Sequence, residues 1–305
     1  MKRGPFFDQT ALLIRTLPVI AAERSFALKG GTAINLFLRN MPRLSVDIDL
    51  TWLPIEPRAE ALANISAALG RIALGIRRSI PDSHVHESRA EIGANISKLV
   101  VQQRDARIKI EPNPVIRGAI FPAQERDLCP KAQSEFELFV SGNTLSVADL
   151  FGGKICAAMD RQHPRDLFDI KLLFANEGLT DDIRKSFIVY LASHDRPMHE
   201  LIDPVRKDIT ALYKNDFLEM TDEPVAIEEL LTAREELVRR LSSELTDTER
   251  RFILSLKNGM PEWNLMDLPN LENLPAIRWK LANIGKITKA KREEQTAMLR
   301  DKLKL

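Results

Sequence analysis

The chain has 305 residues, of which 44% are hydrophobic and 29% are charged. This length is enough for two domains, and this composition is ordinary for a globular protein with a substantial core. The 44 basic and 43 acidic residues give a net charge of +1, which excludes a global field of one sign that would recruit nucleic acid or membrane.

Charge, cysteine and hydropathy patterns narrow the class of protein further. Residues 277–305 contain nine Lys or Arg against three acids, so a basic tail follows a mildly acidic body. Cys129 and Cys156 lie far apart and predict neither a disulfide framework nor a zinc motif. No stretch approaches the ~20 apolar residues that span a bilayer, and no signal peptide is recognisable, so we expect a cytoplasmic protein with no membrane partner.

The first half of the chain alternates between helical and strand-like patterns. In chain order, the patterns predict a helix over 7–24, a short strand over 26–28, a helix over 32–39, a strand over 45–53, a helix over 57–78, two or three strands over 84–112 and a strand over 136–140. Gly142-Asn143 then indicates a turn. The segment with Pro112, Pro114, Pro122 and Pro130 reads as a loop.

From Ser146 onward, every patterned segment is helical. Ser146 and Asp149 form a capping-box-like helix start, and Pro164 is expected to open the next helix. The change of pattern predicts a mixed strand-and-helix domain over 1–145 and a helical domain with a basic tail over 146–305. The fold class is therefore α+β.

Two acids stand out in the segment "RLSVDIDL". The two-residue period of a strand puts Asp47 and Asp49 on one face. The apolar side chains of Val46, Ile48 and Leu50 then pack into the core from the other face. Adjacent carboxylates repel, so they favour a bound cation, and Mg²⁺ (or Mn²⁺) held by carboxylates together with substrate phosphates is the natural partner.

A third acid ends another strand-like segment, "RIKIEPN". Glu111 follows the alternating Ile108 and Ile110, so it could stand beside Asp47 and Asp49 as a metal ligand. Three such carboxylates would suit two metal ions that align an in-line phosphoryl displacement. An exposed acid at a strand end is nearly as good an interpretation of Glu111.

Upstream, "LKGGTAINLFLR" places two glycines where a strand passes into a helix. Gly30 and Gly31 would let the backbone approach a ligand, and the free N–H groups of a helix start attract an anion such as a triphosphate. Thr32 can add a hydroxyl group. A plain helix-entry turn is the alternative for these glycines.

The segment "KICAAMDRQHPRDLFDI" carries a cationic helix face. Lys154, Ala158 and Arg161 lie at i, i+4 and i+7, so two cations share one face, which suits a polyphosphate. Asp166 falls in the first turn of the next helix, where it could pair with Arg161 or Arg165, and Asp169 follows one turn later. The alternatives are a surface lysine at 154 and a purely structural Arg161–Asp166 ion pair.

Together these segments resemble a known family. "KGGTAINLFLRNMPRLSVDIDL" is similar to the active-site motif of nucleotidyltransferases with the DNA polymerase β-like fold. With "IKIEPN", Arg117-Gly118 and "DLFGGKICAAMDRQHPRDLFDI", the chain more closely resembles the AbiEii/MenT group, the nucleotidyltransferase toxins of type IV toxin–antitoxin and abortive-infection systems. The resemblance covers roughly residues 26 to 175.

The resemblance implies a Mg-dependent enzyme that transfers a nucleotidyl group from an NTP to an acceptor hydroxyl, with the 3′ end of tRNA as acceptor. Such a toxin would inhibit translation and be controlled by a cognate antitoxin protein. The implied site residues are Asp47, Asp49, Lys154 and Asp169 for catalysis, Gly30, Gly31, Thr32, Ser45, Lys154 and Arg161 for nucleotide binding, and Asp47, Asp49 and Glu111 for the metal.

The resemblance also concerns regulation and leaves alternatives open. In some relatives, the serine two positions before the first aspartate is phosphorylated to silence the toxin, and Ser45 holds this position. One alternative function is transfer to a small molecule, as in aminoglycoside nucleotidyltransferases. Another is a catalytically inactive nucleotide-binding interaction protein. The basic tail is either a solvated helix face or a contact for an RNA backbone.

Overall fold

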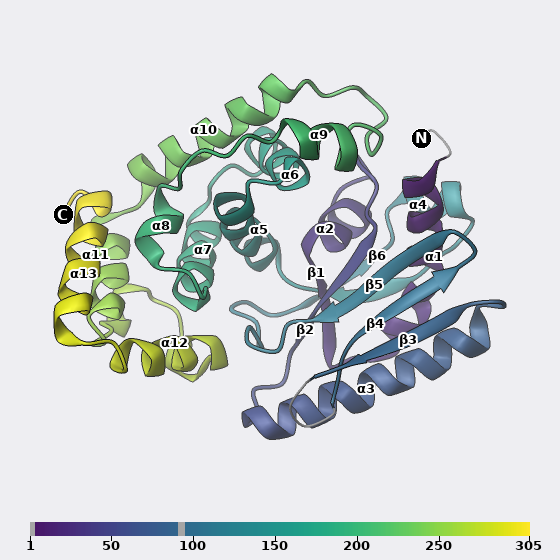
Figure 1. Ribbon diagram of the computed structural model, residues 1–305, viewed down its shortest axis with the longest axis horizontal. Coiled ribbons are helices and arrows are strands. Elements are labelled where there is room, and N and C mark those ends of the chain that lie inside the picture. Colours follow the sequence, from purple (N-terminus) through teal and green to yellow (C-terminus); the bar gives the residue numbers. More distant parts are fainter. Residues whose placement is uncertain (1–3, 91–94) are drawn as a thin grey trace. The chain divides into compact units, whose positions relative to one another are not determined.

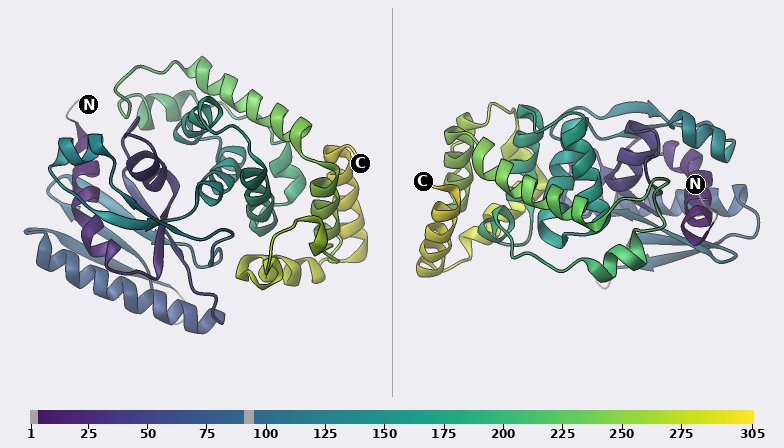
Figure 2. Two further views of the ribbon diagram at one scale, coloured as in Figure 1. Left: turned by 180° about the vertical axis from the view of Figure 1, so that it is seen from behind. Right: turned by 90° about the horizontal axis from the view of Figure 1, so that it is seen from above.

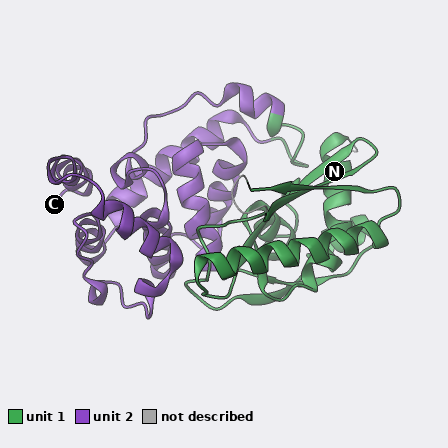
Figure 3. Ribbon diagram, turned by 60° about the horizontal axis from the view of Figure 1, so that its bottom comes forward, with its two compact units in different colours: residues 1–146, 216–224 green, residues 147–215, 225–305 purple. Residues whose placement is uncertain are grey.

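The computed structural model describes residues 4–90 and 95–305 of the chain. It consists of two compact units, shown in different colours in Figure 3. The first unit contains residues 1–146 and 216–224, and the second contains residues 147–215 and 225–305.

A seven-stranded mixed sheet forms the centre of the first unit, with the strand order β3-β4-β5-β2-β1-β7-β6 (Figure 1). The strands are β1 (Phe26–Lys29), β2 (Asp47–Trp52), β3 (His84–Arg89), β4 (Ile96–Gln103), β5 (Ala106–Pro112), β6 (Gln124–Asp127) and β7 (Ser141–Thr144). β2 is antiparallel to β1 and parallel to β5. The strand that carries Asp47 and Asp49 therefore lies in the middle of the sheet.

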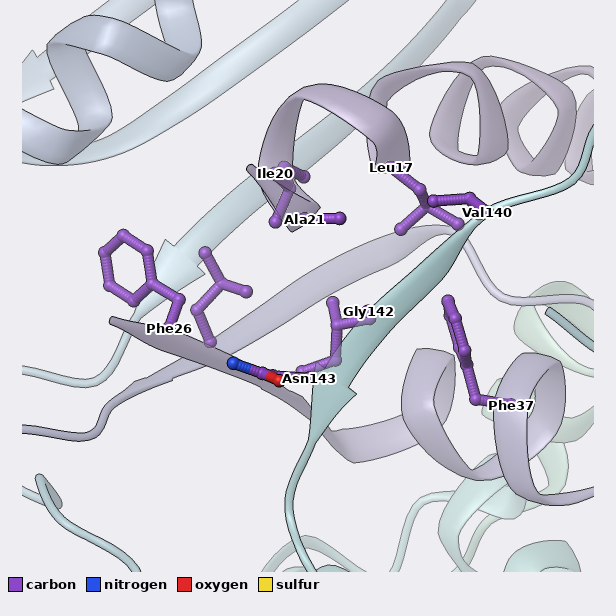
Figure 4. Close-up of a pocket in the computed structure, with 10 residues that line it drawn as sticks. Leu17, Ile20, Ala21, Phe26, Phe37, Val140, Gly142 and Asn143 are labelled. Carbon is purple, nitrogen blue, oxygen red and sulfur yellow. The ribbon is translucent and has the colours of Figure 1, made fainter. Parts of the chain in front are cut away.

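The helices in the described part of the first unit are α1 (Pro5–Ala21), α2 (Gly30–Ala33), which continues as a π-helical segment (Ile34–Leu38), α3 (Arg58–Ser79) and α4 (Pro130–Phe136). Helices α1 and α3 pack together and cover one face of the sheet (Figure 2, left). The apolar side chains of this face, such as Ile48 and Ile110, are fully buried. Leu17 and Ile20 of α1 line a small apolar pocket together with Phe37 and Val140 (Figure 4).

Helix α3 corrects one expectation from the sequence. By length and composition it could cross a membrane, although no such stretch was expected. Its apolar residues are interrupted by charged residues, which hides them from a search for an unbroken apolar run. Ala61, Ile65, Leu69 and Ile72 are buried, and the helix packs on β4, β3 and α1, so α3 behaves as a core helix of a globular unit.

The second unit is built from helices, and no strand occurs between residues 147–215 or 225–305. Its α-helices are α5 (Val147–Arg161), α6 (Pro164–Ala175), α7 (Asp181–Ser193), α8 (Met198–Ile202), α9 (Thr210–Asp216, which ends in the first unit), α10 (Ile227–Glu244), α11 (Asp247–Lys257), α12 (Pro275–Gly285) and α13 (Lys289–Leu303), with short 3₁₀ turns η2 (Trp263–Leu265) and η3 (Leu271–Asn273). Helix α5 packs against α6 and α7, and α10 packs on α6. As predicted, Pro164 opens a helix.

Two parts of the first unit differ from the prediction. The segment between Pro112 and Pro130, predicted to be a loop, contains strand β6, which pairs with β7. The segment 136–140 is not a strand, because Pro130 opens helix α4, which ends at Phe136. The strand is instead β7, and it contains the Gly142-Asn143 pair that was predicted to be a turn. β7 pairs with β6 and β1, so its backbone groups are satisfied by neighbours that lie far away in sequence.

The segment 216–224 returns from the helical half of the chain to the first unit. The backbone N–H of Leu44 donates to the carbonyl of Met220 at 2.8 Å, and Lys131 forms an ion pair with Asp222. This segment thus holds the chain just before β2. The sequence had not indicated such a return.

Candidate active site

The turn from β1 into α2 is shaped by the carboxylate of Asp49. Gly30 has φ of +66°, a left-handed conformation that favours glycine. A Cβ atom at this position would lie 2.5 Å from Oδ2 of Asp49. The strand register explains this proximity, since Asp49 is paired with Lys29, the residue before the turn. A glycine at position 30 is therefore needed to seat this carboxylate at the helix start.

The next glycine makes room for a buried cation. A Cβ atom on Gly31 would lie 2.7 Å from Nη2 of Arg43 and 3.4 Å from Oγ of Ser45. Arg43 is buried, and its Nη1 donates to the carbonyl of Leu44 at 2.8 Å. The two glycines thus have different tasks, because one accommodates a carboxylate and the other a guanidinium group.

Two buried hydroxyl groups join the glycine turn to β2. Thr32 Oγ1 donates to the carbonyl of Asp47 at 2.6 Å. Its only hydrogen is used in this bond, so Ser45 Oγ donates to Thr32 Oγ1 over 2.9 Å. Thr10 Oγ1 in turn lies 2.8 Å from the carbonyl oxygens of both Phe6 and Ser45, which share its one hydrogen. Thr32 and Ser45 therefore position the strand with the two aspartates, and both hydroxyl groups are buried.

The two aspartates lie as the period of the strand predicts. Asp47 and Asp49 are half-buried, whereas Ile48 and Leu50 on the opposite face are fully buried. Within the described residues, no group of three or more His, Cys, Asp or Glu side chains is close enough to hold a metal ion. The structure thus brings together two acids on one strand face and does not bring three together.

Glu111 lies near the pair but interacts elsewhere. The parallel register of β2 and β5 places Glu111 directly opposite Asp49. Its carboxylate Oε1 lies 3.6 Å from Nζ of Lys98, and both side chains are about 40% exposed. Glu111 is therefore a neighbour of Asp49 in the sheet, and its side chain forms a surface ion pair with Lys98.

The second unit contains a cluster of four charged groups, of which Lys154, Asp166 and Asp169 are buried and Arg161 is exposed. Nζ of Lys154 on α5 lies 2.8 Å from Oδ1 of Asp166 and 3.0 Å from Oδ2 of Asp169, both on α6. Nη2 of Arg161 donates to Oδ1 of Asp166 at 2.9 Å. Lys154 is only 5% exposed, so the alternative of a surface lysine is wrong. The predicted Arg161–Asp166 ion pair is confirmed.

The cations of this cluster control the ionisation of Asp166. Burial by itself raises the pKa of this carboxyl group. The charges of Lys154 and Arg161, together with their hydrogen bonds, outweigh that effect and hold the pKa of Asp166 well below its ordinary value. Two cations and two carboxylates thus balance one another.

The candidate site residues fall into two groups that belong to different units. The first unit holds Gly30, Gly31, Thr32, Ser45, Asp47, Asp49 and Glu111, and the second holds Lys154, Arg161 and Asp169. Arg43, whose guanidinium group borders Gly31, was not among the predicted site residues. The sequence contained a sign of its position, because Arg43, Ser45, Asp47 and Asp49 follow one another at a spacing of two residues.

Comparisons with known proteins fit this arrangement. The model of the family described as "Nucleotidyl transferase AbiEii toxin, Type IV TA system" matches residues 11–283. Together with the fold and the Asp-x-Asp strand beside a glycine turn, this match defines a nucleotidyltransferase. Because the match spans most of the chain, the chain belongs to the AbiEii family of nucleotidyltransferase toxins of type IV toxin–antitoxin systems.

The fold is similar to that of MenT4, a nucleotidyltransferase toxin from Mycobacterium tuberculosis H37Rv, with a TM-score of 0.58. The two chains are 13% identical, and the alignment covers 96% of this chain and 91% of MenT4. Among curated proteins, no sequence matches the chain. The predicted fold class, a mixed sheet followed by a helical part, and the resemblance to the AbiEii/MenT group are thus confirmed.

Proposed function

We propose that the protein transfers a nucleotidyl group from an NTP to a hydroxyl at the 3′ end of tRNA and thereby inhibits translation. The observation that carries the proposal is the Asp49 carboxylate, which lies where a side chain at Gly30 would be. This contact joins an acidic strand to the start of a helix. Carboxylates for a cation and N–H groups for a polyphosphate thus meet at one place.

The residues of the first unit fit a divalent cation. Asp47 and Asp49 share one strand face, and the space for the Asp49 carboxylate exists only because position 30 is a glycine. These two acids would hold Mg²⁺ (or Mn²⁺), with Glu111 as the proposed third ligand. The ion would neutralise the phosphates of the bound NTP.

The helix start would bind the triphosphate. Gly30 and Gly31 begin a helical segment that runs through α2 to Leu38, and the first N–H groups of a helix lack partners within the helix. Thr32 and Ser45 would hold this turn against β2 through their hydroxyl groups. The roles of Lys154 and Arg161 in triphosphate binding and of Asp169 in catalysis stay predictions from the family resemblance. In the structure, these three residues belong to the charged cluster of the second unit.

The toxin family supplies the biological setting of the proposal. Members of type IV toxin–antitoxin systems have a cognate antitoxin, so a separately encoded partner is expected for this chain, and the cytoplasm, with its tRNA pool, is the proposed location. Phosphorylation of Ser45 would be one way to silence the enzyme. Ser45 is 4% exposed, so a kinase could reach its hydroxyl only if the segment before β2 opened.

The test is to incubate the purified protein with bulk tRNA, Mg²⁺ and each labelled NTP in turn. The wild-type protein should label tRNA with at least one NTP. Asp49→Asn should reduce labelling by about 10²-fold or more, since it removes a charge that acts at the reacting phosphates. Asp105→Asn is the control, because Asp105 is an exposed acid in the turn between β4 and β5. Equal labelling by Asp49→Asn and Asp105→Asn would refute the mechanism.

A small-molecule acceptor is less well supported. An aminoglycoside is a polycation, so its pocket should be acidic. The pocket between α8, α10 and α13 of the helical unit is lined by four cations (Arg206, Arg239, Lys302 and Lys304) and three acids (Asp203, Glu235 and Asp301). This pocket therefore has no excess of acids, and tRNA remains the proposed acceptor.

A further inference from the structure

One face of the sheet is lined by polar and cationic side chains that point away from α1 and α3. The strand registers place on this face residues of β3, β4 and β5, the three strands beside β2 (Figure 1). We name it the open face and define it by His84, His86, Lys98, Gln102, Arg107 and Lys109. Apart from Lys98, which is 40% exposed at its side chain, all of these residues are exposed.

The open face leads directly to the two aspartates. Lys109 is the register partner of Asp47, Val100 is the partner of Lys109, and His86 is the partner of Val100. At about 4.8 Å between neighbouring strands, this row extends about 14 Å from the acidic pair to the edge of the sheet. A molecule that lies across β3, β4 and β5 would thus contact a continuous row of side chains that ends at Asp47.

The charge of the open face favours an anionic partner. Lys98, Arg107 and Lys109 provide three cations, and the acids that the strand registers place on the same face are Glu111 of β5 and Asp47 and Asp49 of β2. The Lys98–Glu111 pair is weak, since its atoms are 3.6 Å apart and both side chains are well exposed. The part of this face on β3, β4 and β5 thus has a net positive charge, and the two aspartates at its β2 end balance that charge until they bind a cation.

We propose that the open face binds the sugar–phosphate backbone of the acceptor RNA and leads its 3′ end to Asp47 and Asp49. This inference rests on the proposed function. Cations spread over an exposed surface suit phosphates, which follow one another along a strand. A protein partner fits less well, because the cores of protein interfaces are poor in charge and rich in large apolar anchors. The apolar side chain here is Val100, and it is already buried.

The experiment measures binding of bulk tRNA to the full chain without NTP, by filter binding at several salt concentrations. The variants are Arg107→Gln, Lys109→Gln and the double variant. Arg78→Gln is the matched control, because Arg78 is an exposed cation in the last turn of α3, the helix that packs on the opposite face. Thermal melting and NTP binding confirm that each variant is folded.

Each single variant should weaken tRNA binding about five- to tenfold at 0.1 M salt, and the slope of log K against log salt should fall by about one for each lost phosphate contact. Arg78→Gln should change neither quantity. The proposal is overturned if the wild-type protein does not bind tRNA, or if the double variant binds it as tightly and with the same slope as the control. Loss of antitoxin binding with intact tRNA binding would assign the face to the protein partner instead.

Failure of this proposal differs from failure of the proposed function. If the wild-type protein labels no tRNA but the double variant lowers tRNA affinity and the salt slope, the open face binds RNA and the reaction assignment is wrong. If the wild-type protein labels tRNA and the double variant binds tRNA unchanged, the reaction stands and the open face is not the RNA surface.

Discussion

The two groups of charged residues differ in how their charges are balanced. In the second unit, Asp166 and Asp169 are fully buried and are neutralised by Lys154 and Arg161 of the same cluster. In the first unit, two acids lie on one half-buried strand face beside a glycine turn. A fold that contains a buried ion pair is strongly destabilised when one partner is lost, whereas two adjacent carboxylates favour a bound cation.

This difference separates stability from activity. Removal of one member of a buried cluster leaves an uncompensated charge, which destabilises a protein strongly. Removal of one of two half-buried acids that repel each other should change the free energy of unfolding little. It should, however, abolish binding of the cation that the two acids hold together.

The buried cluster should be the more important for stability. Asp166→Asn leaves Lys154 with one carboxylate and Arg161 without its buried partner, so the free energy of unfolding should fall by about 3–5 kcal/mol. The measurement is urea denaturation followed by circular dichroism. Asp181→Asn serves as the control, because Asp181 is paired with Arg184 but its side chain is 81% exposed. If the two variants lose equal stability, the cluster does not hold the second unit together.

The same cluster predicts a dependence on acid. The pKa of Asp166 is lower in the folded protein than its ordinary value of 3.8, so its stabilising effect is complete above pH 3.8 and is lost as the pH falls below that value. The free energy of unfolding of the wild-type protein should therefore decrease more steeply between about pH 4 and pH 2 than that of Asp166→Asn. Parallel pH profiles of the two proteins would contradict this interpretation.

The glycine turn should matter more for activity than for stability. Ala at position 30 adopts a left-handed conformation at a cost of about 1–2 kcal/mol, and its Cβ would displace Asp49 Oδ2. A displacement of about 1 Å reduces catalysis by about 10²-fold, so nucleotidyl transfer should fall by at least this factor.

The chain offers a matched control for this prediction. Gly178 has φ of +68°, close to that of Gly30, and a Cβ at Gly178 would meet nothing within 4 Å. Gly178→Ala should thus show the same strain in urea denaturation and retain its transfer activity. If both variants lose activity equally, strain rather than the Asp49 contact explains the effect.

The sequence was sufficient for the parts of the fold that local patterns determine. The alternation from Val46 to Leu50 predicted both the strand and its two faces, because a strand with one buried face imposes a period of two. Pro164 predicted a helix start for an equally local reason. This period alone was enough to predict that Asp47 and Asp49 lie on the same face of the strand.

Other features depend on partners that lie far away in sequence. β7 was missed because its Gly142-Asn143 pair favours a turn, and only pairing with β6 and β1 makes it a strand. The return of segment 216–224 to the first unit and the Lys98–Glu111 ion pair have the same origin. In the candidate site, the contact between Gly30 and Asp49 follows from the register of β1 with β2, which no single segment encodes.

The Ser45→Ala variant tests whether hydrogen bonds between uncharged groups also stabilise the glycine turn of the first unit. Ser45→Ala removes the buried hydrogen bond to Thr32, so the free energy of unfolding should fall by about 1 kcal/mol, with transfer activity largely retained. The control is Ser243→Ala, because the hydroxyl of Ser243 bonds to its own helix at an exposed position. A loss no larger than that of the control would mean that the Thr32–Ser45 bond does not stabilise the turn before β2.

The smallest effect should come from the surface pair of Lys98 and Glu111. Both side chains are about 40% exposed and their atoms are 3.6 Å apart, so a double-mutant cycle with Lys98→Met and Glu111→Gln should give a coupling energy below about 0.5 kcal/mol. Such a weak pair would let Glu111 turn towards its register partner Asp49 and a bound cation at little cost. At saturating tRNA, where weaker binding to the open face does not limit the rate, transfer activity should then survive Lys98→Met and fall in Glu111→Gln. Equal activities of the two variants would exclude Glu111 as a metal ligand and leave Asp47 and Asp49 as the acids of the site.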